Sequence, residues 1–293
     1  MTNTVVLIGA NSDVGGEVAT RLLDHGHTVI ATARNQDQCA LINAKMPGLS
    51  DIFPLDLGNA ETVFQILGER LGAAQVDGVI VCAAAGAHGP LETASLAGVR
   101  AVLETNALAC LAIYQACLPT LRRRRGRMIL IGSSSGKIAL PFLGAYQASK
   151  FALEALADVM RQEGSMSGVT VVLVEPGGIN TKMVRRMLDA VKQEYRDLHR
   201  SAHRLYGDLY KSFIALSENA DWSKMSTAAQ VADTVIAAYQ CADPEPRYVV
   251  GADAKYLLAE RKVRNDREMD ALAMEIYGVK SLGNGPLNFD NIE

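Results

Sequence analysis

Short apolar runs rich in β-branched residues alternate along the chain with longer stretches of helical periodicity. The runs are brief, apolar and bounded by turn-forming residues, which predicts strands. They are Val5–Ile8, Thr28–Ala31, Ile52–Leu55, Val76–Val81, Met128–Ile131, Val169–Val174 and Tyr248–Val250. The helical stretches are Glu17–His25, Gln38–Lys45, Ala60–Leu71, Leu96–Leu121, Ala145–Glu163 and Thr227–Gln240.

This alternation predicts an α/β fold. Continuous apolar strands separated by helices are typical of a parallel sheet that helices cover on both faces. The expected architecture is therefore a doubly wound, mostly parallel seven-stranded sheet of the Rossmann type. Pro54 lies inside the third run, and because proline removes a ladder hydrogen bond, this strand is expected at an edge. The strand order 3-2-1-4-5-6 of dinucleotide-binding sheets places the third strand there.

The whole chain, residues 1–293, is interpreted as one domain, because no linker rich in Pro, Gly or Ser divides it. Two segments fall outside the alternation. Residues 182–224 are helical and amphipathic, and we interpret them as an insertion beside the substrate site. Residues 260–293 are polar and contain Gly-Asn-Gly-Pro at 283–286, which predicts a loosely attached C-terminal extension.

Apolar side chains recur about every four residues within the insertion. They are Met183, Met187, Val191 and Tyr195, followed by Leu205, Leu209 and Phe213. Such a stripe is either ordinary core packing or the underside of a mobile lid, and the pattern leaves both open. A hydrophobic lining suits a lipophilic ketone or secondary alcohol.

Charge and composition exclude several classes of function. The net charge is −3 and charged residues make up 21% of the chain, so no nucleic-acid partner is expected. His199 and His203 have the i, i+4 spacing of a metal pair, but the sequence offers no third ligand beside them. We therefore expect no metal site.

The chain also carries no targeting signal that we recognise. It passes from Met1 almost directly into an apolar run, without a basic leader. No apolar stretch is judged to approach the roughly 20 residues that span a bilayer. The five cysteines are scattered without a C-x-x-C pair, which suits small buried side chains in a reducing compartment. These observations predict a cytoplasmic protein without a membrane span.

A glycine-rich turn, residues 9–16, follows the first predicted strand and opens the first helix. This is the context of a dinucleotide-binding turn. Glycine lets the backbone approach a pyrophosphate, and the helix N-terminus offers unpaired N–H groups with a partial positive charge. The predicted contacts are Gly9, Asn11, Ser12, Asp13, Val14 and Gly15. The alternative is a tight turn with a purely structural purpose.

Arg34 follows the second predicted strand, where this fold meets the adenosine ribose of the cofactor. An acidic residue there would bind the 2′-hydroxyl of NAD, whereas an arginine suits the 2′-phosphate of NADP. No carboxylate appears before Asp37. The prediction is therefore NADP, with NAD as the alternative cofactor and a solvated surface arginine as the alternative interpretation.

Tyr146 and Lys150 are four residues apart and so share one face of a helix. A nearby cation can lower the tyrosine pKa of ~10 by roughly 1–3 units, toward the range useful for proton exchange with an alcohol or carbonyl. Ser133 follows the fifth predicted strand, at the sheet edge where ligands bind. Asn106 joins them from the long helix before that strand. The structural alternatives are a helix cap or a helix kink for Asn106 and an ordinary loop serine for Ser133.

With these residues the chain resembles the short-chain dehydrogenase/reductase family over roughly residues 4–255. The family's glycine-rich turn is similar to residues 8–15, and its Asn-Ser-Tyr-Lys tetrad is similar to Asn106, Ser133, Tyr146 and Lys150. Beyond the glycine-rich turn and Arg34, the resemblance implies cofactor contacts at Asp56, Leu57, Ala83, Ala84, Gly86, Tyr146, Lys150, Pro176, Gly177, Ile179 and Thr181. Pro141-Phe142, the run 149–154 and the insertion are most similar to the hydroxysteroid and retinol dehydrogenase branch.

The chain departs from the family pattern at two places. Asp13 replaces the middle glycine of the first turn, and a carboxylate near the phosphates lowers affinity unless it turns away or bonds the ribose. Residues 83–86 read Ala-Ala-Ala-Gly where the family usually has Asn-Asn-Ala-Gly. Backbone contacts to the cofactor survive this second change, but side-chain contacts do not.

The resemblance implies an NADP(H)-dependent oxidoreductase that interconverts a carbonyl and a secondary alcohol, on a steroid- or retinoid-like substrate. Tyr146 would be the general acid/base, Ser133 would bind the same oxygen, Lys150 would hold the nicotinamide ribose and Asn106 would position a water. A homodimer or homotetramer through the helices Leu96–Leu121 and Ala145–Glu163 is also implied. Two alternatives remain open: an epimerase or dehydratase on the same fold, and a non-catalytic cofactor-binding scaffold.

Overall fold

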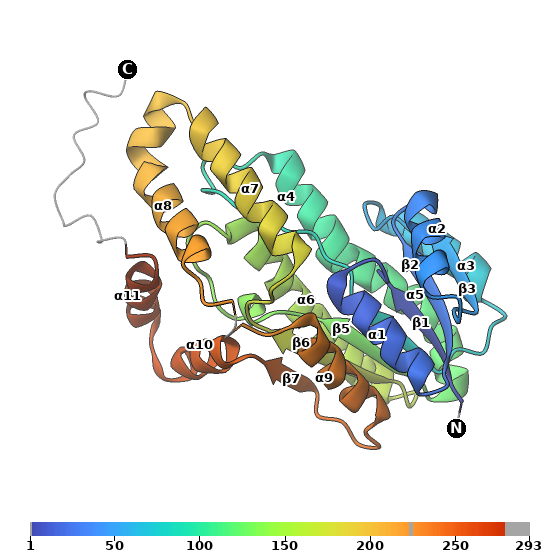
Figure 1. The fold of residues 1–293 in the computed structure, drawn as a ribbon. Coiled ribbons are helices and arrows are strands. Elements are labelled where there is room, and N and C mark those ends of the chain that lie inside the picture. The colour runs from blue at the N-terminus through green and yellow to red at the C-terminus, as the bar shows by residue number, and fades with distance from the viewer. Residues whose placement is uncertain (1, 223–224, 279–293) are drawn as a thin grey trace.

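The fold is built around one parallel sheet, and the computed structural model describes residues 2–222 and 225–278. The strands are β1 (Thr4–Ile8), β2 (Thr28–Ala33), β3 (Asp51–Pro54), β4 (Gly78–Val81), β5 (Arg127–Ile131), β6 (Thr170–Pro176) and β7 (Arg247–Val250). They lie in the order β3-β2-β1-β4-β5-β6-β7, and each neighbouring pair is parallel (Figure 1). The prediction of a doubly wound α/β sheet is confirmed.

Helices cover both faces of this sheet. They are α1 (Asp13–Asp24), α2 (Gln36–Lys45), α3 (Ala60–Leu71), α4 (Leu96–Leu103), α5 (Ala109–Arg124), α6 (Gly144–Ser165), α7 (Lys182–Asp197), α8 (Arg200–Glu218), α9 (Ala228–Gln240), α10 (Ala252–Val263) and α11 (Asp266–Ile276). A π-helical turn, η1 (Glu104–Leu108), joins α4 to α5, and a 3-10 turn, η2 (Ser134–Gly136), follows β5. Helices α1 and α9 pack side by side on one face, and α3 and α5 do so on the other.

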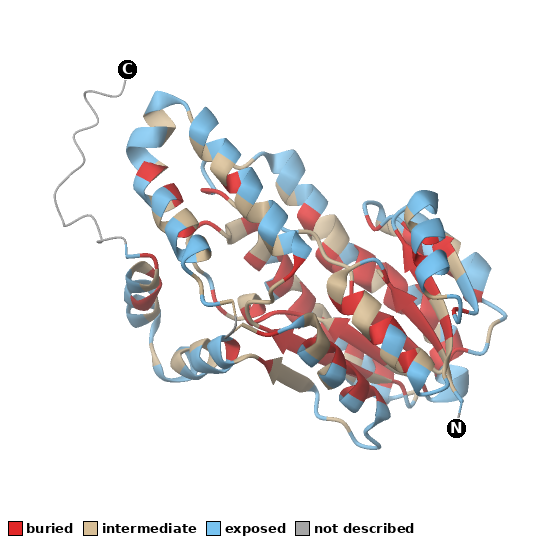
Figure 2. Ribbon diagram, viewed as in Figure 1, coloured by how far each residue is buried: buried red, intermediate tan, exposed pale blue. Residues whose placement is uncertain are grey.

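The alternation of side chains along each strand fills two separate cores. In β1, Val6 and Ile8 point toward α3, α5 and α6, whereas Val5 and Leu7 point toward α1, α2 and α9. These side chains are at most 1% exposed. Figure 2 shows the buried sheet between helices whose outer faces are exposed. Because both faces are covered, the strands are apolar at successive positions.

The edge position predicted for the proline-containing strand is confirmed. Strand β3 pairs only with β2 in the ordered sheet, and Pro54 lies opposite Ala33. The missing N–H of Pro54 therefore leaves the interior of the sheet intact.

The expectation that no apolar stretch approaches the length of a bilayer span is wrong. Within the described residues, the helical run Leu96–Arg124 is long and apolar enough to cross a membrane by length and composition. In the fold, however, Ile113, Cys117 and Leu121 of this run are fully buried in the core beneath the sheet. Helix α5 also packs along α3. We attribute its apolar composition to this packing.

The insertion and the C-terminal extension form a third apolar cluster. Val191 of α7, Phe213 of α8 and Tyr277 after α11 are buried together. Core packing therefore accounts for much of the predicted apolar stripe, although Met183 and Leu205 are 43% and 40% exposed. At the end of α11, Ile276 and Tyr277 pack on this cluster, so this part of the predicted extension contacts the fold. Residues 223–224 and 279–293, including the segment 283–286, lie outside the described residues.

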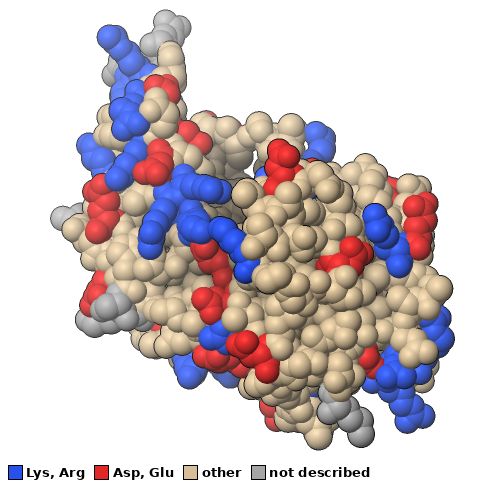
Figure 3. Space-filling view, turned by 45° about the vertical axis from the view of Figure 1, so that its right-hand side comes forward, with Lys and Arg blue, Asp and Glu red and all other residues tan. Residues whose placement is uncertain are grey.

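The basic run at the end of α5 has structural partners. Arg123 donates to the carbonyl oxygens of Gly72 and Ala74, and Arg124 pairs with Asp77 at 2.8 Å. These arginines tie α5 to neighbouring loops at the amino edge of the sheet. Figure 3 shows acidic and basic side chains interspersed over the visible face, with Lys and Arg gathered toward its upper left.

Candidate active site

The glycine-rich turn is shaped by close backbone contacts. Gly9 has a φ of +84°, and a Cβ there would lie 2.6 Å from the Cβ of Ala83. A Cβ on Gly15 would lie 2.2 Å from the carbonyl oxygen of Gly9. Ser12 caps α1, because its Oγ accepts a hydrogen bond from the N–H of Gly15 at 2.9 Å. Backbone without side chains and the first N–H groups of α1 therefore lie together at this turn, which is the arrangement that binds a pyrophosphate. Val14 is buried under the turn and Asn11 is exposed on it.

Asp13 turns toward the insertion. Its Oδ2 accepts a hydrogen bond from the backbone N–H of Lys182 at 2.7 Å, and its Oδ1 lies 3.5 Å from the Lys182 Nζ. Lys182 is the first residue of α7, so the carboxylate stabilises an N–H group that has no partner within the helix. The residue that departs from the family pattern therefore connects the glycine-rich turn to the start of the insertion.

Replacing Asp13 with alanine should loosen the start of α7. Loss of the acceptor costs about 0.5–2 kcal/mol locally. We expect the Lys182 amide to exchange its hydrogen about 2–30-fold faster, measured by amide hydrogen exchange. Asp37→Ala, which removes an exposed acidic residue from the first turn of α2, is the control and should leave this amide unchanged. An unaltered Lys182 amide in Asp13→Ala would reject the contact.

The next predicted cofactor residues follow β2, β3 and β4. Arg34 is exposed, and its backbone N–H donates to Gln38 at 3.2 Å. Asp56 is also exposed and accepts from the N–H of Gly58 at 3.1 Å, which closes a tight turn. Leu57 is only 5% exposed and its side chain packs in the core, where it stabilises the fold. The segment at residues 83–86 leaves β4 beside Gly9.

Asn106 lies in the π-helical turn between α4 and α5 and is 1% exposed. Its Oδ1 accepts from the N–H of Ala85 at 2.7 Å, and its Nδ2 donates to the carbonyl oxygen of Ala85 at 2.8 Å. The same Nδ2 donates to Ser149 Oγ at 2.9 Å. Single π-helical turns are frequent at functional sites. Here the turn fastens the strand-end loop after β4 to helix α6.

Tyr146 and Lys150 occupy the first two turns of α6, on the same face. The Lys150 Nζ lies 5.8 Å from the centroid of the Tyr146 ring and donates to the carbonyl oxygen of Ile131 at 2.9 Å. Lys150 is 2% exposed, whereas Tyr146 is half-buried. Ser149 donates to the Tyr146 carbonyl at 2.6 Å and thereby links Asn106 to this helix. The ammonium group is thus held in place between strand β5 and the phenol.

Ser133 ends the loop from β5 at the same edge and is 7% exposed. Its Oγ donates to the carbonyl oxygen of Pro176 at 3.4 Å, a long bond that leaves the hydroxyl able to turn. After Pro176 the chain passes through Gly177, which donates to Val250, and through half-buried Ile179. Thr181 then caps α7.

Phe142 connects the insertion to the segment that enters α6. Its φ of +74° is unusual for a bulky residue and marks local strain. The ring packs with Phe213 and Tyr210 of α8, at centroid distances of 4.5 and 4.7 Å. Its carbonyl oxygen accepts from Gly89 at 2.8 Å. Aromatic packing of the insertion therefore reaches to within four residues of Tyr146.

The structure brings the predicted residues together at one edge. Because the strands are parallel, the segments after β1, β2, β3, β4, β5 and β6 all leave the sheet at its carboxyl side. Sequence reasoning missed Ser149, which lies inside the Tyr-Lys motif, and it missed Phe142 as a contact to the insertion. It also missed Glu175, although a carboxylate inside an otherwise apolar strand is itself a signal.

Known proteins share this sequence pattern and fold. Residues 3–192 match the sequence model of the short chain dehydrogenases. The chain is 30% identical over 277 residues to 3-amino-tetrahydro-pyrrolizinone reductase from Xenorhabdus hominickii, covering 92% of this chain and 94% of that protein. It is 31% identical over 261 residues to 17-beta-hydroxysteroid dehydrogenase type 1 from Homo sapiens, covering 85% and 77%. The structure of a short chain dehydrogenase from Burkholderia cenocepacia J2315 in complex with NADP aligns with a TM-score of 0.68 at 22% identity, covering 94% and 97%, and shows the same fold.

Proposed function

This chain belongs to the short-chain dehydrogenase/reductase family, and we propose that it interconverts a carbonyl group and a secondary alcohol with NADP(H), using Tyr146 as general acid and base. Its assignment as an oxidoreductase follows from the family and from relatives that are dehydrogenases and reductases. The observation that carries the finer proposal is the convergence of Ser133, Tyr146 and Lys150 at the carboxyl edge of the sheet. Asn106 supports the proposal by joining the loop after β4 to α6.

The proposed roles follow from this geometry. In the direction of reduction, the phenolic hydroxyl of Tyr146 gives its proton to the substrate oxygen. The Ser133 hydroxyl, released from its long bond to Pro176, donates to the same oxygen and stabilises the charge that develops there. The buried ammonium of Lys150 stabilises negative charge on the phenolic oxygen as the proton leaves. When bound, the nicotinamide supplies or accepts the hydride.

The glycine-rich turn fits a dinucleotide. A Cβ at Gly9 or Gly15 would collide with neighbouring atoms of the chain, so both glycines are needed for the tight shape of the turn. The N-terminus of the twelve-residue helix α1 points its first N–H groups at this place. We propose that the turn holds the pyrophosphate and that Asp56, the backbone at 83–86, Gly177, Ile179 and Thr181 complete the contacts.

Arg34 is the proposed contact to the 2′-phosphate of NADP. Its side chain is exposed between the end of β2 and the start of α2. A guanidinium recognises a phosphate through paired charge-assisted hydrogen bonds. The NADP found in the Burkholderia cenocepacia protein, which shares the fold, supports the same cofactor for this chain.

Arg34→Leu should therefore weaken NADPH more than NADH. Loss of a charge-assisted hydrogen bond worth about 1.5–3 kcal/mol corresponds to roughly a 10–150-fold rise in the NADPH dissociation constant. Titration of the fluorescence of each reduced cofactor measures the two constants. Lys45→Leu removes the same charge at the far end of α2 and should change neither constant. An equal loss for both cofactors in Arg34→Leu would reject the assignment.

We propose a lipophilic substrate. The apolar cluster of the insertion reaches Leu140 and Leu143 before Tyr146, and Met187 lies partly buried against it. The human relative is a hydroxysteroid dehydrogenase, which supports a bulky ring ketone or alcohol. The test is NADPH oxidation, followed by absorbance, with a panel of ketones that runs from steroid-like to small and polar. Turnover confined to the small polar ketones would reject the lipophilic class.

We also propose that the protein forms a homo-oligomer and is cytoplasmic. Leu96 of α4, Leu108 of η1, and Phe151 and Val159 of α6 are large apolar side chains, each 43–70% exposed. They lie on the two helical segments that the family resemblance implies as the interface. Exposed apolar residues on neighbouring helices support burial in a second copy of the chain.

A further inference from the structure

Two glutamates are buried beside the site without a part in the proposed proton transfer. Glu175 of β6 is 0% exposed, and Glu154 of α6 is 7% exposed. Glu175 directly precedes Pro176, the residue whose carbonyl oxygen accepts from Ser133. Glu154 lies one helical turn beyond Lys150 on the same face of α6. Carboxylates are rarely this buried unless they are paired.

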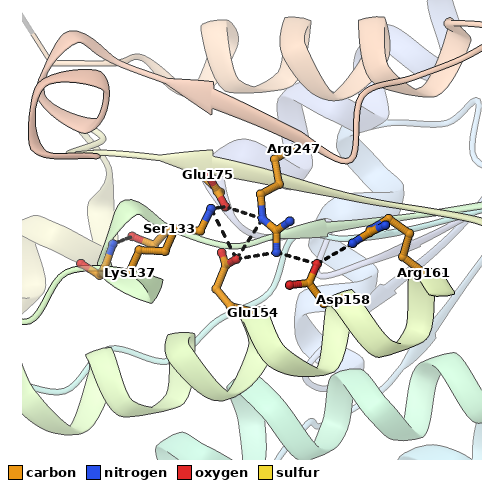
Figure 4. Close-up of polar contacts among 8 residues, drawn as sticks. Ser133, Lys137, Glu154, Asp158, Arg161, Glu175 and Arg247 are labelled. Atoms are coloured by element: carbon orange, nitrogen blue, oxygen red, sulfur yellow. Dashed lines mark hydrogen bonds and ion pairs between the residues drawn. The ribbon is translucent and has the colours of Figure 1, made fainter. Parts of the chain in front are cut away.

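Cations from two other elements reach this pair. Lys137, just after η2, lies 2.7 Å from the Glu175 Oε1 and 3.8 Å from the Glu154 Oε2. The Arg247 guanidinium at the start of β7 lies 3.1 Å from each of these oxygens and 2.8 Å from Asp158. Figure 4 shows this guanidinium among the three carboxyl groups. Each glutamate therefore has one oxygen that faces positive charge.

The hydrogen bonding of the pair is incomplete among the described residues. The Glu154 Oε1 and both oxygens of Glu175 are buried without a hydrogen-bond partner, although the Glu175 Oε1 lies in ion-pair range of Lys137 and Arg247. The two carboxyl groups are neighbours, because the Glu154 Oε2 and the Glu175 Oε1 each lie 3.1 Å from the Arg247 Nε. A hydrogen bond between the two groups would need one proton, because ionised carboxylates only accept hydrogen bonds. Burial, and then the charge of Glu175, raise the pKa of Glu154 to about 7.

The pair lies where three parts of the candidate site meet. A Cβ added to Gly136 of η2 would lie 2.7 Å from the Glu154 Cγ and 3.0 Å from the Lys150 carbonyl oxygen. The loop after Ser133 is therefore seated directly on the face of α6 that carries Lys150. Lys137 fastens that loop to β6 through Glu175. The pair therefore lies between the loop that follows Ser133 and helix α6.

We propose that Glu154 and Glu175 share one proton, and that this carboxyl pair is a positioning unit which holds Ser133 against the helix face of Tyr146 and Lys150. The positioning role rests on the proposed function of those three residues. The shared proton does not, because it concerns only the burial and the neighbours of the two carboxyl groups. Glu154 and Glu175 act by positioning Ser133 and α6, and neither side chain contacts a reacting atom.

The groups facing the pair decide how it responds to pH. They are Lys137 after η2 and Arg247 on β7. Asp158 of α6 pairs with Arg247 and with Arg161, whereas the Lys150 ammonium donates to the Ile131 carbonyl oxygen. Asp253 of α10, which packs near η2, instead accepts from the N–H of Gly178 at 2.6 Å. The folded state holds a proton that an unfolded chain releases above the ordinary glutamate value of 4.5. The pair's contribution to stability is therefore full below that value and is lost as the pH rises through about 7.

The shared proton is tested by carbon-13 spectroscopy of glutamate side-chain carboxyl groups in the whole protein. We expect carboxyl signals that titrate with a midpoint near 7 and that disappear in Glu154→Gln. Glu163→Gln, an exposed change on the same helix, should leave them in place. If the signals of Glu154 and Glu175 both titrate in the ordinary glutamate range, the shared proton is wrong.

The positioning role is tested by steady-state kinetics with a ketone that the wild type reduces. Glu154→Ala should lower kcat about 10–100-fold and leave the KM for NADPH unchanged, because the substrate-side geometry is disturbed. Glu154→Gln keeps a hydrogen-bond donor toward Glu175, so it should restore most of kcat and remove the pH dependence between about 6 and 8. Should Glu154→Ala fail to fold, the pH profile of Glu154→Gln decides: a profile unchanged from the wild type overturns the positioning role. A wild type without turnover, but with the carboxyl titration, rejects the proposed function and retains the shared proton.

Discussion

Tyr146→Phe should lower kcat by about 10²–10⁴ while NADPH binds as tightly as it does to the wild type. The substitution removes one oxygen, which is the proposed proton donor, and keeps the ring over which the Lys150 ammonium lies at 5.8 Å. The half-buried ring leaves the fold of α6 undisturbed. Single-turnover reduction of a ketone, together with a fluorescence titration of NADPH, separates the loss of chemistry from a loss of binding.

The matched control is Tyr256→Phe. Tyr256 lies on α10 and is 52% exposed, so the loss of its hydroxyl should leave kcat unchanged. Full activity in Tyr146→Phe would mean that another group gives the proton. A parallel fall in activity and in NADPH affinity would instead assign Tyr146 to cofactor binding alone.

Gly15→Ala should abolish dinucleotide binding and destabilise the protein by about 1–3 kcal/mol. The added Cβ would lie 2.2 Å from the Gly9 carbonyl oxygen and 2.8 Å from the Ser12 Oγ, so the turn has to open. Opening the turn breaks the cap of α1, which Ser12 provides by accepting from the Gly15 N–H. Urea denaturation measures the stability, and the NADPH titration measures the binding.

Gly16→Ala provides a control one residue away. A Cβ there has no neighbour closer than 3.7 Å, and alanine is favoured over glycine inside a helix by roughly 0.5–1 kcal/mol. This variant should bind NADPH normally and unfold at the same or a higher urea concentration. If the two variants behave alike, the close approach of Gly15 to Gly9 is not what the turn requires.

The fold could be predicted from the sequence because its signals are local. Each strand is an apolar run, since helices cover both faces of the sheet, and the runs from Val5 and Thr28 appear in the structure within two residues of their predicted ends. The edge position of β3 followed from a single proline. The glycine-rich turn and the Tyr-Lys pair were visible because their residues are adjacent or one helical turn apart.

Features that depend on contacts between distant segments could not be predicted. Asp13 looked unfavourable near phosphates, and only the fold shows that it reaches the start of α7, 169 residues away in the chain. The π-helical turn at Asn106 interrupts a stretch whose periodicity reads as one helix. In the sequence, Glu154 and Glu175 cannot be distinguished from ordinary surface charges. Only the packing of β6 and α6 gives them a common partner in Arg247. The contact of Tyr277 with Phe213 of α8 was missed because the two residues lie far apart in the sequence.

The most direct test follows the hydride itself. NADPH carrying deuterium at the transferable C4 position is incubated with the protein and a steroid-like ketone, and the product is analysed by mass spectrometry. The account predicts one deuterium on the carbinol carbon of the product alcohol, formed by the wild type and not by Tyr146→Phe. NADPH that keeps its deuterium while the whole ketone panel stays unreduced would contradict the central claim.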